Sequence, residues 1–473
     1  MKPLFLKVTL FDPSSNQQFP VTAETMDDLV VDIVPMRFGN VVGLHSPVQL
    51  QPKDRNSGIY FVHDDAFQPE DNYFLRVQFA KRMFSVKRGQ FITLDEVTND
   101  AQPLLFPTRL PAWDSGWDND YRDNEFFGDG DLKGDFTEQN PLQLRVPLRE
   151  FFNVGHRGAP YHFAENTIAS FQKALHLGAN GFEFDLSLTK DDHILVYHDA
   201  VQDTIAIQRR WQEGLPYPVV SPEFDVINGS MHVSIKKLRN GQYEQSPWRP
   251  LKSPYEFDLI NLTAAEVHEY FRYKHMDGVE HRMPELDEFL EFVSSKADQV
   301  KFLFFDIKNP GSSRGDEKSH MRRYGELVGK ALKKYRPLAE KMVICNVEPD
   351  YIDELKAGVG DSGEKRPEFA YDAGAALFKS DALKIANERR TTVVSIGAAG
   401  RPGDLDDVKS AVRCRDYPQE YPHITTRITS VVHWTLNERK QILESFMGGV
   451  NGILTDKPDE LKRVLLEGMK VRV

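Results

Sequence analysis

An imidazole and a guanidinium stand side by side in this chain, where an apolar run ends. The run FFNV leads directly into Gly155-His156-Arg157-Gly158. The flanking glycines allow a sharp turn and let a ligand come close to the main chain. Histidine transfers protons near neutral pH, and arginine binds anionic groups through a permanent charge. The pair indicates proton transfer at an anionic substrate, with an ordinary surface turn as the alternative.

Three carboxylates stand on two later apolar runs. Glu183 and Asp185 lie two positions apart in GFEFDLSL, and Asp306 lies two positions before Lys308 in KFLFFDIK. Residues i and i+2 of a strand point to the same face, so each pair is predicted to share one face. Buried like charges need a compensating cation. A metal ion would supply it, and a carboxylate pair shared with lysine is the alternative.

The three carboxylates define the kind of metal that such a site would take. Glu183, Asp185 and Asp306 offer only oxygen ligands, and hard oxygen donors select Mg²⁺ or Ca²⁺ over zinc. Three protein ligands leave open positions for water and for a substrate oxygen. We therefore expect one divalent cation, Mg²⁺ or Ca²⁺, acting as a Lewis acid on a phosphoryl oxygen.

A second histidine, His198, ends the run HILVYHD. With His156 it would form a general acid–base pair. Arg157 and Lys308 would neutralise the negative charge that builds up in the transition state. Such a set of groups is suited to the cleavage of a phosphodiester.

Short apolar runs alternate with helix-like segments from residue 150 onward, which predicts a (β/α)8 TIM barrel with an open doubly wound sheet as the alternative. In such a barrel the reacting groups sit at the carboxyl ends of the strands. The predicted strands are FFNVG, GFEFDLSL, KFLFFDIK, MVICNV, EFAYDAG, TTVVSIG, SVVHWTL and GILTD.

Three other regions complete the predicted organisation. Residues 1–97 contain short alternating apolar runs separated by turn sequences, which predicts a β-rich, sandwich-like domain. Residues 98–149 are rich in aspartate, and we expect an acidic linker that packs on the barrel through Trp113 and Trp117. The barrel, 150–473, carries a proline-rich insertion at 200–262. This insertion would act as a lid or select the substrate, or alternatively hold the N-terminal domain.

The overall composition excludes several classes of protein. A net charge of −12 argues against a mainly electrostatic nucleic-acid binder. No apolar run approaches the roughly 20 residues of a membrane span, so we expect no integral membrane segment and leave peripheral membrane contact open. The N-terminus does not have the pattern of a signal peptide. We expect a cytoplasmic protein, with secretion without a visible leader as the alternative.

The series of short motifs after residue 150 resembles the glycerophosphodiester phosphodiesterase family, within the phospholipase C-like phosphodiesterase superfamily of TIM barrels. The resemblance implies a metal-dependent enzyme that hydrolyses glycerophosphodiesters, such as glycerophosphocholine, to glycerol 3-phosphate and an alcohol. The matching pieces are GHRG (155–158), ENT (165–167), GANGFEFD (178–185), TKD (189–191), HD (198–199), PELDE (284–288), DIK (306–308), HWT (433–435) and GVNGILTDKP (449–458).

The resemblance also implies a role for each matching side chain. The implied roles are acid–base catalysis for His156 and His198, metal binding for Glu183, Asp185 and Asp306, and phosphate or substrate binding for Arg157, Lys308, Glu165 and Trp434.

One position departs from the family pattern. The third metal ligand is usually a glutamate in E-x-K, and here it is Asp306. Barrel enzymes similar to spider-venom sphingomyelinase D also carry an aspartate there and cleave lipids. The alternative function is therefore a phospholipase D-like cleavage of lysophospholipids or sphingolipids. A weakly active lipid- or sugar-binding barrel is a remote third hypothesis.

Overall fold

The computed structural model describes most of the barrel and parts of the region before it. The described residues are 4–11, 18–19, 21, 29–37, 40–41, 48–54, 57–62, 72–79, 82–85, 90–93, 105–110, 137–147, 151–198, 222–239, 242–253, 255–274, 279–310, 317–360, 366–373, 382–397, 405–416, 418–447 and 449–469. The expected packing of Trp113 and Trp117 lies outside these residues.

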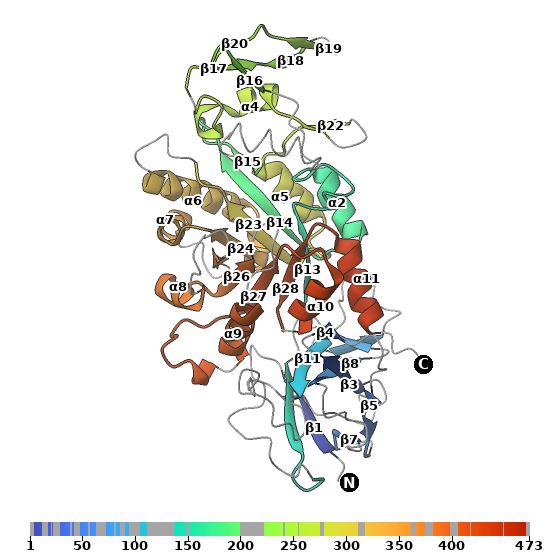
Figure 1. Cartoon of the computed structure of the whole chain (residues 1–473). Helices are drawn as coiled ribbons and strands as arrows, with labels where there is room; N and C mark the ends of the chain where they lie inside the picture. Colours follow the sequence, from blue (N-terminus) through green and yellow to red (C-terminus); the bar gives the residue numbers. More distant parts are fainter. Residues whose placement is uncertain are drawn as a thin grey trace.

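Eight parallel strands form a closed barrel in the middle of the molecule (Figure 1). Pairing follows the order β13-β28-β27-β26-β25-β24-β23-β14, and β13 pairs with β14 to close the ring. The closure confirms the predicted TIM barrel and excludes an open sheet. The strands are β13 (Phe152–His156), β14 (Gly181–Leu188), β23 (Phe302–Ile307), β24 (Met342–Asn346), β25 (Glu368–Asp372), β26 (Val393–Gly397), β27 (Ser430–Trp434) and β28 (Gly452–Thr455).

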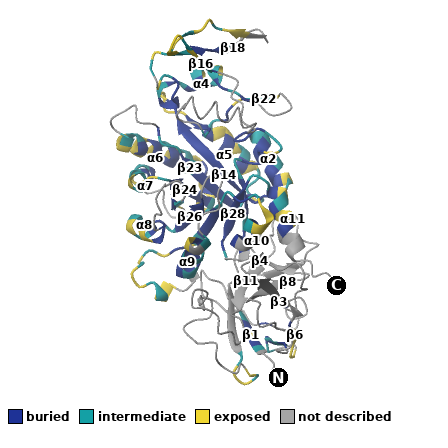
Figure 2. Ribbon diagram, viewed as in Figure 1, coloured by how far each residue is buried: buried dark blue, intermediate teal, exposed yellow. Residues whose placement is uncertain are grey.

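A helix follows each barrel strand and packs on the outside of the barrel, with its buried face toward the strands (Figure 2). In α5, for example, the buried residues are Leu286, Phe289, Leu290 and Val293, which form one apolar stripe of an amphipathic helix. The helices are α2 (Ile168–His176), α5 (Leu286–Ser295), α6 (Glu317–Lys334), α7 (Pro349–Val359), α8 (Ala382–Arg389), α9 (Leu405–Asp416), α10 (Arg439–Met447) and α11 (Pro458–Met469).

Alternation along β14 decides which side chains enter the barrel. Phe182 and Phe184 belong to the outer core beneath the helices, and the ring of Phe184 lies 4.1 Å, centroid to centroid, from that of Phe289 on α5. Because successive strand residues point to opposite faces, Glu183 and Asp185 point to the interior. Apolar packing on the outside therefore forces two carboxylates inward.

The described part of the 200–262 insertion forms a small β-rich lobe beyond the carboxyl end of β14 (Figure 1). Figure 1 places this lobe at the opposite end of the barrel from the N-terminal sheets, so this part does not hold them. Its elements and their flanks are β15 (Ile194–Val196), β16 (Glu223–Ile227), β17 (Ser230–Ser234), β18 (Lys236–Arg239), β19 (Gln242–Gln245), β20 (Arg249–Pro250), η5 (Leu259–Asn261), α4 (Ala264–Tyr270), β21 (Tyr273–Lys274) and β22 (Glu280–His281). Two further short helices in the barrel are η6 (Arg336–Lys341) and η7 (Pro418–Glu420).

The N-terminal region is β-rich, as predicted, but its sheets extend past residue 97. One sheet has the order β12-β1-β7-β6 with β2 beside β1, and another has β11-β8-β3-β4 with β5 beside β3. Strands β11 and β12 fall inside 98–149, the region expected to be an acidic linker. The strands are β1 (Leu4–Phe11), β2 (Gln18–Phe19), β3 (Leu29–Arg37), β4 (Asn40–Val41), β5 (Val48–Gln49), β6 (Gln51–Pro52), β7 (Ile59–Val62), β8 (Asn72–Phe79), β9 (Arg82–Ser85), β10 (Gln90–Thr93), β11 (Leu105–Leu110) and β12 (Leu142–Pro147).

Candidate active site

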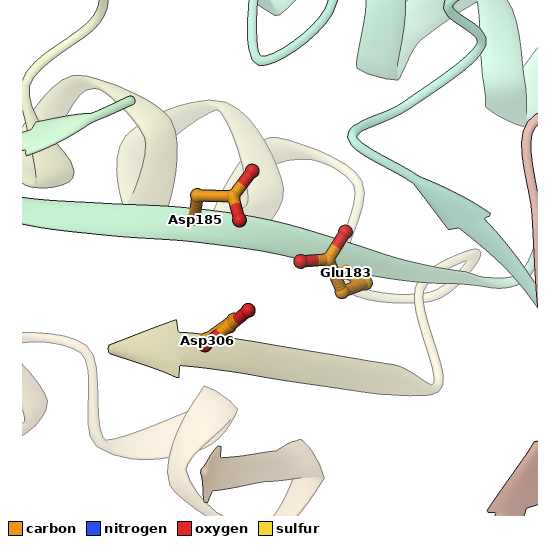
Figure 3. A group of neighbouring side chains, drawn as sticks. All are labelled: Glu183, Asp185 and Asp306. Carbon is orange, nitrogen blue, oxygen red and sulfur yellow. The ribbon is translucent and has the colours of Figure 1, made fainter. Parts of the chain in front are cut away.

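Three neighbouring strands bring the predicted polar residues to the carboxyl end of the barrel. His156 on β13 lies opposite Glu183 on β14, and Asp185 on β14 lies opposite Asp306 on β23. Glu183, Asp185 and Asp306 point into the same space (Figure 3), and each offers an oxygen within 4.8 Å of the others. The two residues on β14 are almost completely buried. The cluster expected from the sequence therefore exists in the fold.

Two cations neutralise Asp185 in particular. The Arg157 Nε lies 3.0 Å from the Asp185 Oδ2, and the Lys308 Nζ lies 2.9 Å from its Oδ1. The same Lys308 Nζ lies 2.6 Å from the Asp306 Oδ2. Burial would raise the pKa of Asp185, but Arg157, Lys308 and His198 outweigh it and hold that pKa well below its usual range. Lysine thus does bridge the two aspartates.

Glu183 receives less charge compensation from Arg157 and Lys308 than Asp185 does. Its Oε2 accepts a hydrogen bond from the Arg157 main-chain N–H at 3.0 Å, and the His156 Nε2 is 3.7 Å away. Burial and the charge of Asp185 together raise the pKa of Glu183 to about 8. A divalent cation beside Glu183 and Asp306 would supply the missing positive charge, and the oxygen donor set suits such an ion. The residues therefore fit a hard metal ion as well as the lysine.

The loop after β13 is held in a tight turn that aims Arg157 at the cluster. Arg157 and Gly158 have positive φ angles of 55° and 91°, and a Cβ on Gly158 would lie 2.4 Å from the Ser170 Oγ. Only glycine fits this approach to α2. The Arg157 Nη1 also donates to the Glu165 Oε2 at 2.9 Å. Glu165 therefore orients the Arg157 guanidinium.

Sequence reasoning missed Asn166 as a site residue. Its side-chain amide donates to the Asp185 Oδ2 at 2.7 Å, and it is fully buried with φ of 56°. Asn is among the few residues that adopt this conformation readily. The ENT motif (165–167) already contained this residue. A buried amide that hydrogen-bonds to a carboxylate fixes the orientation of that carboxylate.

Asp456 is a second residue that sequence reasoning did not select. Its Oδ1 lies 2.6 Å from the His156 Nδ1, and the Asn437 Nδ2 donates to its Oδ2 at 2.7 Å. Burial would lower the pKa of His156, but the carboxylates of Glu183 and Asp456 outweigh it and raise that pKa. Because Asp456 holds the Nδ1, the Nε2 of His156 faces the three carboxylates. The TD pair in GVNGILTDKP was the available signal.

His198 returns to the same end of the barrel through β15. This short strand pairs antiparallel with β14, with Leu186 opposite Val196, and the Tyr197 N–H donates to the Asp185 carbonyl at 2.9 Å. A positive charge on His198 lowers the pKa of Asp185. The imidazole is therefore within electrostatic range of Asp185.

Trp434 lies at the end of β27, and the hydrogen-bond partner of its indole is on β25. The indole Nε1 donates to the Asp372 Oδ1 at 2.6 Å. The side chain is partly buried against the inner core of the barrel. The predicted substrate-binding residue thus reaches the mouth, but from the side of β25 to β27.

Comparison with known proteins identifies the family to which this geometry corresponds. Residues 156–460 match the glycerophosphoryl diester phosphodiesterase family. This chain belongs to that family. The match begins at His156 and ends beyond Asp456, so the whole barrel site lies within the family region.

Curated proteins resemble this chain over short stretches of sequence. A Caldanaerobacter subterraneus glycerophosphodiester phosphodiesterase is 50% identical over 50 residues, which cover 11% of this chain and 21% of that protein. A probable glycerophosphodiester phosphodiesterase 1 of Mycobacterium tuberculosis is 30% identical over 113 residues, 24% of this chain and 35% of its own length. A lysophospholipase D of Rattus norvegicus is 42% identical over 48 residues, 10% of this chain and 15% of that protein. The matched stretches thus span about a third or less of these relatives.

Two solved structures of phosphodiesterases are similar to this chain. A Silicibacter pomeroyi glycerophosphoryl diester phosphodiesterase, described as putative, is 16% identical and covers 68% of this chain and 94% of its own, with a TM-score of 0.46. A phosphodiesterase of Oleispira antarctica, solved with its product sn-glycerol-3-phosphate, is 14% identical and covers 66% and 95%, with a TM-score of 0.42.

His433 precedes Trp434 in the family's HWT segment but points to the outside of the barrel. Its Nδ1 lies 2.9 Å from the Ser445 Oγ on α10, and burial lowers its pKa to about 4. The unfolded chain takes up this proton near pH 6.5. Stability that is present above pH 6.5 is therefore lost as the pH falls toward 4, by up to about 3 kcal/mol.

We predict that His433→Gln flattens this acid loss of stability. Denaturant unfolding at pH 7, 5.5 and 4.5 would measure the free energy of unfolding of both proteins. The variant is expected to be less stable at pH 7 but to lose less on acidification. Equal pH slopes for the two proteins would show that His433 does not stay neutral in the fold.

Proposed function

We propose that this protein hydrolyses glycerophosphodiesters, such as glycerophosphocholine, to glycerol 3-phosphate and an alcohol. The observation that carries the proposal is the group of three carboxylates within 4.8 Å of one another. It stands beside a histidine and an arginine at the carboxyl end of a family barrel. Anionic ligands, cations and proton-transfer groups together are what phosphodiester cleavage requires.

Glu183, Asp185 and Asp306 would hold one divalent cation, Mg²⁺ or Ca²⁺. Such an ion supplies Lewis acidity to a phosphoryl oxygen. In the proposal, Lys308 shares the two aspartates with the ion and adds a positive charge beside the phosphate. Arg157 does the same from the β13 side, held in place by Glu165.

The two histidines would move the protons. One imidazole accepts a proton from the attacking water, whose oxygen bonds to phosphorus, and the other donates a proton to the alcohol oxygen that leaves. Asp456 holds His156 through Nδ1, so its Nε2 is the nitrogen available to the substrate. His198 would approach from the β15 side. His156 at the end of β13 and His198 just after β15 would thus supply the two proton transfers.

A phospholipase D-like reaction on lysophospholipids is the second candidate function. The insertion lobe exposes Val226 and Trp248 to solvent, and Tyr255 is likewise exposed. Apolar side chains on a lobe beyond the barrel mouth would suit a substrate with an acyl chain or contact with a membrane surface.

The structure's described residues contain no helix with the length and apolar character needed to cross a bilayer.

A substrate panel separates these functions. Purified protein would be given glycerophosphocholine and lysophosphatidylcholine with Mg²⁺ or Ca²⁺, and glycerol 3-phosphate and choline would be measured. Release of glycerol 3-phosphate from the water-soluble diester supports the proposal. Choline release from the lysolipid alone would favour the second function, and binding without turnover of either would favour a weakly active binding barrel.

Asp306→Glu is expected to shift substrate preference while metal binding is kept. The added methylene lengthens the reach of the third carboxylate and changes its contact with the Lys308 Nζ, which lies 2.6 Å from the Asp306 Oδ2. We expect the ratio of kcat/KM for the soluble diester over the lysolipid to rise several-fold, about 1 kcal/mol in relative barrier. Unchanged rates on both substrates would mean that the aspartate has no role in preference.

A further inference from the structure

The indole of Trp434 crosses an entire strand to reach its partner. Asp372 ends β25, Ser395 lies opposite it on β26, and Val432 on β27 is at the same level. Trp434 is two residues further along β27, on the same face as Val432. Neighbouring strands are about 4.8 Å apart, so the hydrogen bond from Trp434 to Asp372 spans β26.

Gly397 on β26 makes this crossing feasible. It lies opposite Trp434 in the sheet. A Cβ at Gly397 would lie 2.4 Å from the Trp434 Cδ2 and 2.7 Å from its Cε2. Real contacts of this kind do not come so close, so any side chain at 397 would displace the ring. The indole therefore lies directly over the backbone of β26.

Asp372 is the group that holds the far edge of the ring. It is 7% exposed and accepts hydrogen bonds from the Trp434 Nε1 at 2.6 Å and the Ser395 Oγ at 2.9 Å, both on Oδ1. Burial and the charge of Asp306 raise its pKa to about 7. Asp306 lies opposite Cys345 on β24, and Cys345 lies opposite Ala370 on β25. Asp372 is two residues beyond Ala370, so it points to the same face of the sheet as Asp306.

The position of the ring explains what it would touch. Trp434 packs on the inner core of the barrel, whose buried members include Val432 and Ala370. These buried side chains fill the inside of the barrel below the ring. The partly exposed ring therefore lies at the carboxyl end, which also carries Glu183 and Asp306. An aromatic face fixed there offers a flat apolar surface for carbon-bearing groups of a ligand.

We propose that Asp372, with Gly397, is a positioning residue that fixes the Trp434 indole as the wall of the substrate site opposite the carboxylate cluster. The wall contacts the carbon-bearing alcohol groups of the diester while the phosphate lies at the cluster. This inference rests on the proposed function for its substrate. The geometric part, in which Asp372 sets the orientation of the indole, has a test of its own.

Steady-state kinetics on glycerophosphocholine test the substrate contact. Asp372→Ala and Trp434→Phe each remove the hydrogen bond and are expected to raise KM about tenfold, with kcat within about threefold of wild type. Asp372→Asn keeps an acceptor oxygen and should restore most of the loss. Because the two residues act as one unit, the double variant Asp372→Ala/Trp434→Phe should be no worse than either alone. Additive losses, or no rescue by asparagine, would overturn the proposal.

The indole N–H resonance gives a reading that needs no turnover. Trp434→Phe assigns the signal by its disappearance, and Asp372→Ala should shift it upfield while Asp372→Asn leaves it near the wild-type position. Ser445→Ala is the matched control, because it removes a buried hydrogen bond from the outer face of the same strand and should move neither the signal nor KM. If the wild type does not cleave the diester, the proposed function fails, yet the signal still decides whether Asp372 holds the ring. A signal that Asp372→Ala leaves unmoved would overturn the positioning role.

Discussion

His156→Asn is expected to lower kcat for glycerophosphodiester hydrolysis by roughly 10²–10⁴-fold, the usual contribution of a general acid or base. The imidazole is fixed by Asp456 at 2.6 Å and faces Glu183 at 3.7 Å. Asparagine can still hydrogen-bond to Asp456 but has no group that exchanges a proton near neutral pH. The measurement is kcat across pH 5–9, and we expect His198→Asn to give a loss in the same range.

His193→Asn is the matched control for the histidine variants. His193 lies just before β15 and is half exposed, with its Nδ1 3.0 Å from the Glu285 Oε2. We expect its kcat to stay at the wild-type value. A His156→Asn enzyme that kept more than about a tenth of the wild-type rate would remove this residue from proton transfer.

Removing divalent cations is the second change with a large expected effect. Dialysis against EDTA should reduce hydrolysis to background, and adding back Mg²⁺ or Ca²⁺ should restore it. Among the three carboxylates, Glu183 should change its protonation most when the ion binds, because burial and the charge of Asp185 raise its pKa to about 8 without an ion. Below that pH the ion must displace the proton. Calorimetry at pH 7 in two buffers should therefore show close to one proton released per ion.

Variants separate the ligand role from a general loss of charge. Glu183→Gln should abolish both ion binding and proton release, whereas Asp353→Asn, on the outer helix α7, should change neither. Full activity in excess chelator would contradict the metal requirement. Ion binding that released no proton at pH 7 would instead place the ion away from Glu183.

The strands and the carboxylate cluster could be predicted from the sequence because both follow from local pattern. In GFEFDLSL, phenylalanine alternates with Glu183 and Asp185, and a strand turns that alternation into two faces. The position at the carboxyl end then followed from the barrel. Asp306 and Lys308 were found in the same way, and the bridging lysine was one of the two alternatives that the pattern left open.

What the sequence did not reveal depends on contacts between distant segments. Asp456 meets His156 across 300 positions of chain, and Asp372 meets Trp434 across 62. Asp456 follows Thr455 in a short motif, but nothing local says that its partner is His156, and no motif marks Asp372. Strand β12 was missed for the same reason, because its partner in the sheet is β1. Local periodicity carries no information about such pairings.

The pairing of β12 with β1 has a consequence for dissecting this protein. The two strands run parallel, with Leu6 opposite Leu142 and Phe11 opposite Pro147, and β13 with its histidine begins only at Phe152. A fragment starting at residue 98 would keep β12 but lose β1, and would leave a bare strand edge that invites association with other chains. A barrel prepared on its own should therefore start after residue 147, so that no unpaired strand precedes β13, which carries His156.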